Sequence, residues 1–257
     1  MVPEAIESPN SVLRVEHVSK TYTTISRESV LALDDVSLDI RENEVLTVIG
    51  PSGCGKSTLL RLIEGLEEPT SGTIERQDGR APFRVGFMFQ DASLMRWRTI
   101  YDNVKLPLEV LGKKDEGEIV RLLKMVQLTG FERKYPFELS GGMQRRVAMA
   151  RALVHKPSIL LLDEPLTGVD ELTKEALQAE LMQIIRAINV TAVHVTHDID
   201  QAVYFSDRVL VMSARPGKII GEIDVQLPRE RKLSLRTEQA FYDYCKRLRQ
   251  ALRLPTD

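Results

Sequence analysis

A glycine-rich segment between an apolar run and a helical pattern constrains this 257-residue chain more than any other feature. The run Glu44–Ile49 is rich in β-branched residues and predicts a strand. Next comes Gly50–Thr58, whose sequence GPSGCGKST fits the pattern G-x-x-x-x-G-K-[ST]. A strand, a glycine loop and a helix in this order predict an α/β core. The apolar spacing after the loop predicts a helix with one buried face, formed by Leu59, Leu60, Leu62, Ile63 and Leu66.

The residue types in this loop suit the phosphate groups of a nucleotide. Glycines let backbone N–H groups approach phosphate oxygens, and the start of the helix adds its positive dipole end. We expect Lys56 to reach the β- and γ-phosphates and Ser57 to place its hydroxyl on Mg²⁺. The alternative is a chance match in a glycine-rich turn, which the flanking strand and helix argue against. The expected phosphate contacts are Gly50, Pro51, Ser52, Gly53, Cys54, Gly55, Lys56, Ser57 and Thr58.

Two further runs, Ile159–Leu162 and Thr191–Val195, are mostly apolar and predict strands covered on both faces, hence a parallel sheet between helices. Asp163 and Glu164 follow the first run, at the strand end where parallel sheets bind their ligands. Asp163 is suited to hold Mg²⁺ and Glu164 to polarise the attacking water. Without the phosphate loop, two solvated acids at a strand end would be the simpler interpretation.

Single polar residues near other strand ends are weaker candidates. His197 follows the run Thr191–Val195 and could donate a hydrogen bond to the γ-phosphate, whereas His194 inside the run is expected to be structural. Gln90 follows the strand-like run Val85–Phe89 and could ligate Mg²⁺ or water. An isolated glutamine carries little weight by itself.

A second glycine loop, Leu139–Gln144, precedes the helical run Arg145–Leu153. Ser140 and the backbone N–H groups there could bind another anion, although Ser-Gly-Gly is also an ordinary helix-capping turn. Two phosphate-binding elements are redundant for one nucleotide in one chain. They make sense when a second copy supplies the other half of the site.

Taken in order, these segments resemble the nucleotide-binding subunit of an ABC transporter over about residues 12–225. The glycine loops resemble the Walker A loop and the signature motif, and Ile159–Glu164 resembles Walker B. The resemblance implies that Tyr22 stacks on adenine, that Gln90 lies in the Q-loop, that His197 is the switch histidine and that Asp170 belongs to the D-loop. It also implies a P-loop NTPase fold of class α/β, with a mainly parallel sheet, an N-terminal antiparallel β part and an inserted helical lobe.

The implied domain is an ABC ATPase domain at residues 12–225, with the helical lobe at about 91–153. Helical spacing within that lobe runs through Val120, Leu122, Leu123 and Val126. Residues 226–257 are expected to form a C-terminal helical tail. Its apolar positions favour an amphipathic helix packed on the chain's own body, and a contact with a partner subunit or the permease is the alternative.

The resemblance further implies an ATPase that uses ATP and Mg²⁺ and works as a head-to-tail dimer. Each ATP would lie between one chain's phosphate loop and the partner's signature motif, at Ser140, Gly141, Gly142 and Gln144. The implied partners are a second ATP-binding subunit, two transmembrane permease subunits and, indirectly, a solute-binding protein, at the cytoplasmic face of the membrane. The segment Ser213–Ile219 looks like the importer branch for nitrate, sulfonate or taurine. Thr167-Gly168-Val169 before Asp170 and Met95-Arg96-Trp97 depart from that branch and leave the solute open.

The composition of the chain fits this assignment, and sequence features argue against the alternative functions. The net charge of −2 gives no general reason to expect nucleic acid, and the apolar runs are far too short for a bilayer. Two cysteines, without a secretory leader, suggest a reducing cytoplasm. The main alternative is a soluble ABC ATPase acting on DNA or ribosomes, which usually carries a coiled coil, zinc modules or a second copy of the domain. A GTP switch is a second alternative, but this chain has no Asn-Lys-x-Asp motif to read the base. A non-hydrolysing binding module is a third, and intact Asp163, Glu164 and His197 argue against it.

Overall fold

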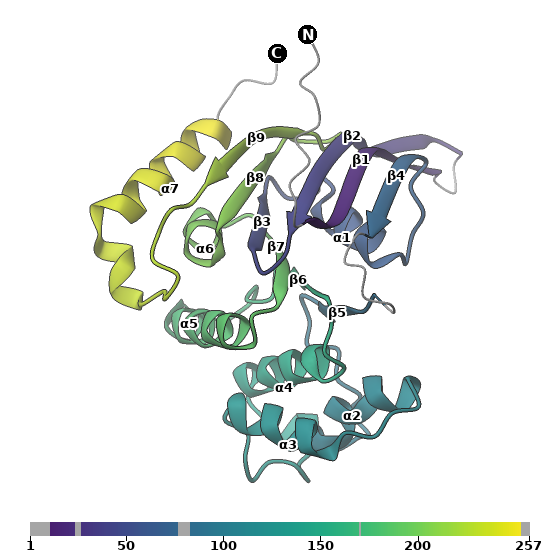
Figure 1. Ribbon diagram of the computed structural model, residues 1–257, viewed down its shortest axis with the longest axis vertical. Helices are drawn as coiled ribbons and strands as arrows, with labels where there is room; N and C mark the ends of the chain where they lie inside the picture. The colour runs from purple at the N-terminus through teal and green to yellow at the C-terminus, as the bar shows by residue number, and fades with distance from the viewer. Residues whose placement is uncertain (1–10, 24–26, 77–82, 170, 253–257) are drawn as a thin grey trace.

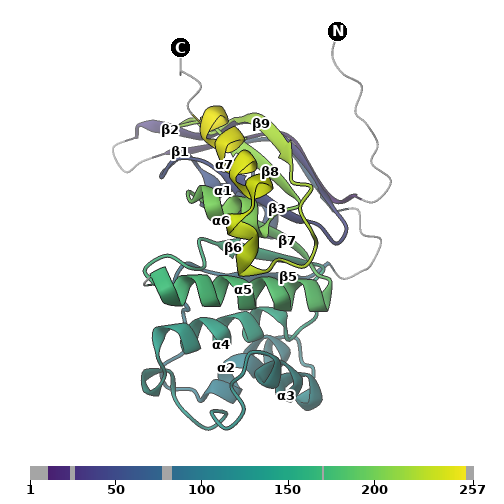
Figure 2. The same ribbon diagram turned by 90° about the vertical axis from the view of Figure 1, so that its left-hand side faces the viewer.

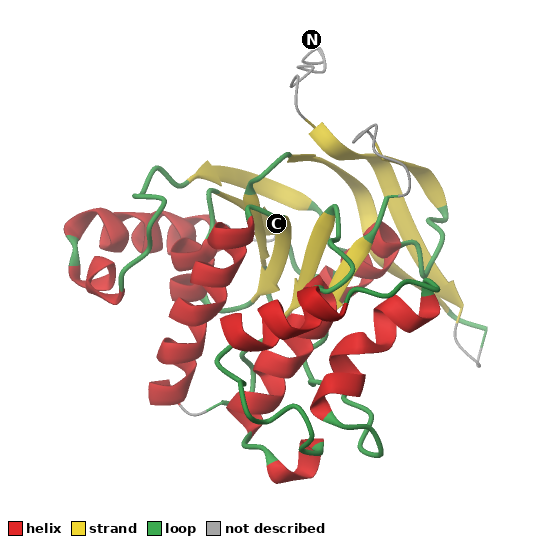
Figure 3. Cartoon of the chain, turned by 60° about the horizontal axis from the view of Figure 1, so that its bottom comes forward, coloured by secondary structure: helices red, strands yellow, loops and turns green. Residues whose placement is uncertain are grey.

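The computed structural model describes residues 11–23, 27–76, 83–169 and 171–252. Two sheets lie at one end of the molecule, and a group of helices lies at the other end (Figure 1). In Figure 3 the helices gather beneath the strands of both sheets. The description below follows the elements from the central sheet outward.

The central sheet confirms the mainly parallel arrangement. In the described residues it has the order β5-β6-β7-β3-β8-β9, and only the pairing of β8 with β9 is antiparallel. All residues of β3 and β7 are buried, as expected of strands covered on both faces. The strands are β3 (Val45–Ile49), β5 (Val85–Met88), β6 (Ile159–Asp163), β7 (Thr191–Thr196), β8 (Arg208–Met212) and β9 (Ile219–Asp224).

The N-terminal antiparallel part is a second sheet with the order β2-β1-β4. Its strands are β1 (Ser11–Thr23), β2 (Ser29–Arg41) and β4 (Ser71–Arg76). Helix α1 (Lys56–Glu64) follows the phosphate loop and buries Leu59, Leu60, Leu62 and Ile63 in the core shared with this sheet. The prediction for Leu66 is wrong, because Gly65 takes a φ of 86° and ends the helix, which leaves Leu66 64% exposed.

Helices α2 (Ile100–Val110), α3 (Glu116–Met125) and α4 (Gly141–Leu153) form the helical lobe at the bottom of Figure 1, with the short helix η1 (Pro136–Glu138) before α4. The lobe shares a hydrophobic core with one face of the central sheet. Leu122, Leu123 and Val126 are buried there as predicted. The prediction for Val120 is wrong, since its side chain is 57% exposed. Ile119 instead occupies the buried face of α3.

The remaining helices complete the cover of the central sheet. They are α5 (Glu171–Ile188), α6 (Ile199–Phe205), η2 (Leu233–Thr237) and α7 (Gln239–Leu252). Helix α7 lies along α6 and β8 and buries Phe241, Cys245 and Leu248, so the tail packs on the chain's own body (Figure 2). Over the described residues, no helix has both the length and the apolar character that a membrane crossing requires.

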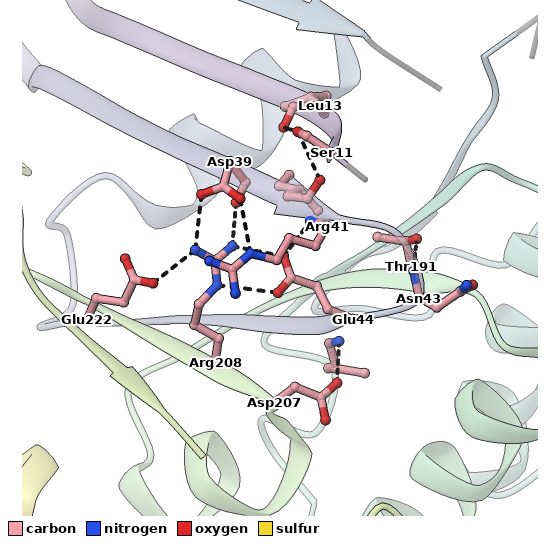
Figure 4. Close-up of polar contacts among 12 residues, drawn as sticks. Ser11, Leu13, Asp39, Arg41, Asn43, Glu44, Thr191, Asp207, Arg208 and Glu222 are labelled. Atoms are coloured by element: carbon pink, nitrogen blue, oxygen red, sulfur yellow. Dashed lines mark hydrogen bonds and ion pairs between the residues drawn. The ribbon is translucent and has the colours of Figure 1, made fainter. Parts of the chain in front are cut away.

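An ion-pair network centred on Arg208 joins the two sheets (Figure 4). Arg208 is buried on β8, and its guanidinium donates to Glu44 Oε1 at 2.9 Å, Glu222 Oε1 at 3.0 Å and Asp39 Oδ1 at 3.2 Å. Asp39 belongs to β2 and Glu222 to β9, while Glu44 precedes β3. One side chain therefore links the antiparallel sheet to the middle and the edge of the parallel sheet.

Candidate functional site

A hollow of about 400 Å³ brings together residues from six separate segments. The phosphate loop and the start of α1 contribute most of its wall, and the end of β6 supplies Asp163 and Glu164. Tyr22 and Gln90, two of the predicted site residues, also line it, and Arg215 joins them without having been predicted. The full lining is Tyr22, Val30, Ala32, Ser52, Gly53, Gly55, Lys56, Ser57, Thr58, Gln90, Asp163, Glu164 and Arg215.

The phosphate loop holds Lys56 in a nearly buried position at the start of α1. Its ammonium donates to the carbonyls of Gly50 at 2.9 Å and Pro51 at 3.1 Å. Gly55 precedes it with a φ of 109°, and a Cβ there would lie 2.9 Å from the carbonyl oxygen of Ala32. Glycine is therefore required at position 55 by both conformation and space. The loop curls around a fixed cation, as phosphate binding needs.

Ser57 and Asp163 form an oxygen-rich corner of the hollow. The Ser57 hydroxyl donates to Asp163 Oδ1 at 3.0 Å. Burial raises the pKa of the Asp163 carboxyl, so a cation bound beside it would stabilise the ionised form. Hydroxyl and carboxylate oxygens are the ligands that Mg²⁺ prefers, and Mg²⁺ commonly takes few protein ligands beside substrate phosphates. The residues present at this corner thus fit the metal that the sequence predicts.

Glu164 is held by two neighbours at the strand end. His197 Nδ1 lies 3.0 Å from Glu164 Oε2, and the Thr167 hydroxyl donates to the same oxygen at 3.2 Å. Glu164 Oε1 lies 3.7 Å from the Lys56 ammonium. The backbone of Glu164 has a φ of 43°, in the left-handed region that side-chain-bearing residues rarely adopt. The turn after β6 thus places the Glu164 carboxylate in the wall of the hollow, in contact with His197.

Tyr22 lies where β1 approaches the phosphate loop. Its hydroxyl donates to Glu67 Oε2, and the Lys20 ammonium lies 5.1 Å from the centre of its ring. Burial and the Glu67 carboxylate raise the pKa of the Tyr22 phenol. The aromatic side chain is thus anchored at its polar end and presents its ring at the edge of the hollow.

His194 is structural, as expected. It is fully buried in β7, its ring Nδ1 lies 3.2 Å from the Thr47 hydroxyl, and its ring packs on Phe205. Burial lowers the pKa of His194 to about 3, so the ring is neutral near pH 7. It takes no part in the lining of the hollow.

The second glycine loop does not reach the hollow within one chain. Ser140 caps α4 by accepting a hydrogen bond from the Met143 N–H at 3.3 Å, and Gln144 donates its side-chain amide to the Pro136 and Leu139 carbonyls. None of Ser140, Gly141, Gly142 or Gln144 lines the hollow formed by the described residues. Asp170, the D-loop residue, lies outside the described residues.

Arg145 is a residue that the sequence interpretation missed. Its guanidinium donates to the carbonyl of Gln90 at 3.0 Å and to the carbonyls of Pro165 and Thr167. It therefore ties α4 to the segment after β5 and to the turn after β6. No local sequence signal marks this role, because the three acceptors lie at least 20 residues away along the chain.

The site and the fold define an α/β ATPase whose phosphate loop and acid pair meet at the carboxyl ends of parallel strands. The profile of the ABC transporter family matches residues 33–167, just over half of the chain, and the chain belongs to this family. Within the family it is an ATP-binding, ATP-hydrolysing cassette.

Relatives and solved structures agree with this assignment. The aliphatic sulfonates import ATP-binding protein SsuB of Bacillus cereus is 39% identical over 239 residues, which cover 92% of this chain and 94% of the relative. The nitrate transport protein NasD of Klebsiella oxytoca is 46% identical over 231 residues, 86% of this chain and 87% of the relative. An ATP-binding cassette solved as a dimer in a post-hydrolysis state, bound to ADP and Pi, is similar with a TM-score of 0.70 at 32% identity. That match covers 84% of this chain and 100% of the other.

Proposed function

We propose that this chain is the ATP-hydrolysing subunit of an ABC importer for a small solute such as nitrate, a sulfonate or taurine. Two copies would act head to tail with two permease subunits at the cytoplasmic face of the membrane, and a solute-binding protein would deliver the solute. Support for the importer class comes from the names of the relatives, one a sulfonate importer and one a nitrate transport protein. Support for the dimer comes from the cassette solved as a dimer.

The observation that carries the dimer is the separation of the two glycine loops. Lys56, Ser57, Asp163 and Glu164 line one hollow, whereas the loop at Ser140 stays outside it. The Ser140 loop begins helix α4, and its N–H groups can bind an anion supplied by another molecule. A second copy turned head to tail would bring its loop at Ser140 over the phosphate loop of the first copy. Each ATP would then be bound between two chains.

The proposed chemistry follows from the side chains in the hollow. Lys56 and the loop N–H groups would bind the β- and γ-phosphates, and Tyr22 would stack on the adenine ring. Ser57, Asp163 and Gln90 would hold Mg²⁺, which neutralises charge on the β- and γ-phosphate oxygens when it is bound. Glu164 would polarise the attacking water and accept its proton. His197, which contacts the Glu164 carboxylate, would keep that group in line with the γ-phosphate.

A second hollow, of about 540 Å³, is the proposed docking site for a permease helix. It lies between α2 and β5, beside the segment that follows Gln90, and its wall is largely aromatic and aliphatic. Arg151 donates to the carbonyls of Ala92 and Ser93 and so fixes that segment beside the hollow. The apolar lining includes Phe83, Val85, Phe87, Phe89, Leu106, Pro107, Val110 and Leu111.

The variant Glu164→Gln tests the dimer and the role of the carboxylate together. We expect it to bind ATP but to hydrolyse it at least about a hundredfold more slowly, because an amide cannot accept the proton of the attacking water. Undegraded ATP should then hold two chains together, and size-exclusion chromatography with and without ATP measures this. Adding Ser140→Arg should abolish the ATP-dependent dimer by obstructing the second glycine loop. A Glu164→Gln chain that stays monomeric with ATP bound would contradict the head-to-tail arrangement.

Co-purification tests the transporter assignment separately. A tagged wild-type chain, extracted from membranes in mild detergent, should bring down an integral membrane protein in about equal amount. If it instead co-purifies with DNA or ribosomes, the soluble ATPase alternative is correct.

A further inference from the structure

His197 contacts the Glu164 carboxylate, but the two residues come from different segments of the chain. Glu164 belongs to the turn that leads from β6 into α5, and His197 belongs to the turn between β7 and α6. Their side chains meet where His197 Nδ1 lies 3.0 Å from Glu164 Oε2, and the side chain of His197 is 51% exposed there. Because packing covers only half of the His197 ring, its position depends on what holds the two turns together.

Asp198, the next residue in the chain, fixes the backbone after His197. It is the N-cap of α6, and its Oδ1 accepts a hydrogen bond from the Gln201 N–H at 3.1 Å. The N–H of Asp198 donates to the Thr196 hydroxyl at 3.1 Å, and Thr196 ends the buried strand β7. The backbone on both sides of His197 is therefore anchored, on one side by the strand and on the other by the helix cap.

Lys174, near the start of α5, joins this anchored turn to the segment that carries Glu164. Its ammonium donates to Asp198 Oδ2 at 2.8 Å, and the two side chains are only 18% and 26% exposed. Although burial favours the neutral form, the bond from Lys174 and the capping bonds lower the pKa of the Asp198 carboxyl. The carboxylate is thus ionised at pH 7, and solvent screens this partly buried pair less than a surface pair.

The two segments are therefore joined twice, once by His197 and Glu164 and once by Lys174 and Asp198. Two contacts restrain the relative rotation of two turns, which a single contact permits. Such restraint matters for chemistry, because a misplacement of about 1 Å in an active site can cost about a hundredfold in rate.

We propose that the ion pair between Lys174 and Asp198 positions His197 against Glu164 for ATP hydrolysis. Lys174 is a positioning residue, since it does not line the nucleotide hollow. The inference rests on the proposed roles of Glu164 and His197. Without Lys174, Asp198 keeps its cap on α6 but loses its link to α5, so the two turns can shift relative to each other. Hydrolysis should then slow while ATP still binds.

Steady-state ATPase assays and nucleotide binding by the full chain test the positioning role. Lys174→Gln should lower kcat about fivefold or more and leave the Kd for ATP within about twofold of wild type. Lys174→Arg should restore most of the turnover, because a guanidinium also donates to a carboxylate. The matched control Glu180→Gln breaks the pair between the same helix and Arg146 of α4, whose side chains are both 25% exposed. It should turn over ATP as the wild type does, and equal turnover of Lys174→Gln and this control would overturn the proposal.

A double-variant cycle tests whether Lys174 and Asp198 act as one unit. Asp198→Asn keeps a side-chain oxygen for the helix cap but removes the charge that Lys174 contacts. Combining it with Lys174→Gln should slow hydrolysis no further than the slower single variant does, because both changes break the same contact. Single effects that multiply in the double variant would contradict the proposal. If Lys174→Gln does not fold, wild-type turnover by Asp198→Asn would contradict it as well.

His197→Ala, measured in the same assay, separates this inference from the proposed function. If His197→Ala loses turnover and Lys174→Gln does not, the proposed role of His197 stands and the positioning role of Lys174 is wrong. If His197→Ala hydrolyses ATP as the wild type does, the proposed role of His197 and the positioning role of Lys174 are both wrong. Loss of turnover in both variants, with ATP binding retained by Lys174→Gln, supports the inference.

Discussion

His194 shows how one buried side chain can set the pH dependence of the whole fold. Burial in β7 lowers its pKa to about 3, from the ordinary value of 6.5, because a charged ring would be desolvated. The unfolded chain therefore binds a proton at this residue between about pH 6.5 and 3, whereas the folded chain does not. The contribution of His194 to stability is complete above about pH 6.5 and is lost as the pH falls through this range.

We expect the free energy of unfolding to fall by about 1.4 kcal/mol per pH unit below pH 6 from this residue alone. Burial also lowers the pKa of His155, which acts in the same direction. Replacing His194 with Gln should flatten the slope between pH 6 and 4.5, whatever it does to stability at pH 7. Urea unfolding at several pH values measures this. An unchanged slope in the variant would show that His194 is not the proton acceptor of the unfolded chain.

At this scale, the sequence predicted side chains that belong to short contiguous motifs. Lys56 and Ser57 lie on a loop whose whole geometry is local, and Asp163 and Glu164 end a strand whose burial is visible in its composition. Arg145 was missed because its three acceptors lie on segments far from it in sequence. No periodicity or spacing marks such a contact before the fold is known.

At the scale of elements, α4 is held to the site through Arg145. The helix belongs to the helical lobe, yet this guanidinium donates to carbonyls on both sides of the hollow, at Gln90 and at Pro165 and Thr167. Burial lowers the pKa of Arg145, but the group stays charged at pH 7 because an arginine pKa lies so high. Any shift of the lobe would therefore move the turn that carries Glu164.

We expect Arg145→Gln to lower the ATP turnover number about tenfold while changing ATP affinity less than about threefold, because Arg145 does not line the nucleotide hollow. Arg145→Lys should restore only part of the activity, since one ammonium cannot reach three carbonyls. Steady-state ATPase assays and nucleotide binding by fluorescence separate the two effects. The control Arg121→Gln loses a pair with Glu118 inside α3 and should behave as the wild type. If the ATP turnover number of Arg145→Gln is within about twofold of wild type, Arg145 does not position the turn that carries Glu164.

The boundaries of elements show where sequence patterns stop being informative. Helix α1 begins at Lys56, as the loop motif required, but its end depends on Gly65, whose left-handed backbone stops the helix one residue before Leu66. In α3 the apolar spacing is compatible with a buried Val120, but packing within the lobe buries Ile119 and leaves Val120 exposed. Propensity and period predict that a helix exists, and tertiary contacts decide which side chains it buries.

At the scale of the whole molecule, the order of the strands in the central sheet could not be predicted from the sequence. The run that became β3 pairs with β7 and β8, which follow it by more than a hundred residues. The Arg208 network depends on this order, since it joins β2, β8 and β9 with Glu44. Burial raises the pKa of Glu44 despite its bonds to Arg208, whereas Arg208 lowers the pKa of the less buried Asp39 against the effect of burial.

We expect Arg208→Met to reduce the free energy of unfolding by about 3–5 kcal/mol, because it leaves the surrounding carboxylates, and buried Glu44 above all, without their cation. The double variant Arg208→Met with Glu44→Gln should recover part of this loss, since it removes the buried carboxylate as well. Chemical denaturation of both variants gives the difference. The control Lys218→Met breaks a surface pair with Asp34 and should cost far less, because solvent screens such a pair. Equal stability of Arg208→Met and the control would show that water solvates this cluster.

Trp97 does not line the 540 Å³ hollow but belongs to the segment beside it, so it can test whether the proposed permease contact extends over this segment without disturbing the fold. It follows Gln90 in the chain and is 76% exposed, whereas Leu94 in the same segment packs against the core of the helical lobe. Asn103 fixes the segment through the backbone of Met95, accepting from its N–H at 2.8 Å and donating to its carbonyl at 3.1 Å. A large aromatic side chain held in solvent on a fixed segment is typical of an interface anchor.

We therefore expect Trp97→Ala to leave the thermal midpoint of the isolated chain within about 1–2 °C of wild type, since little buried surface is lost. ATP binding by the isolated chain should also be unchanged. The amount of permease that co-purifies with it, or transport in reconstituted vesicles, should fall about tenfold or more, as for an interface anchor that contributes about 2 kcal/mol. Tyr242→Ala, which removes another exposed aromatic from α7, is the matched control and should assemble normally. Normal assembly and transport by Trp97→Ala would place the permease contact elsewhere, and a chain that no longer folds would show that Trp97 packs against its own lobe.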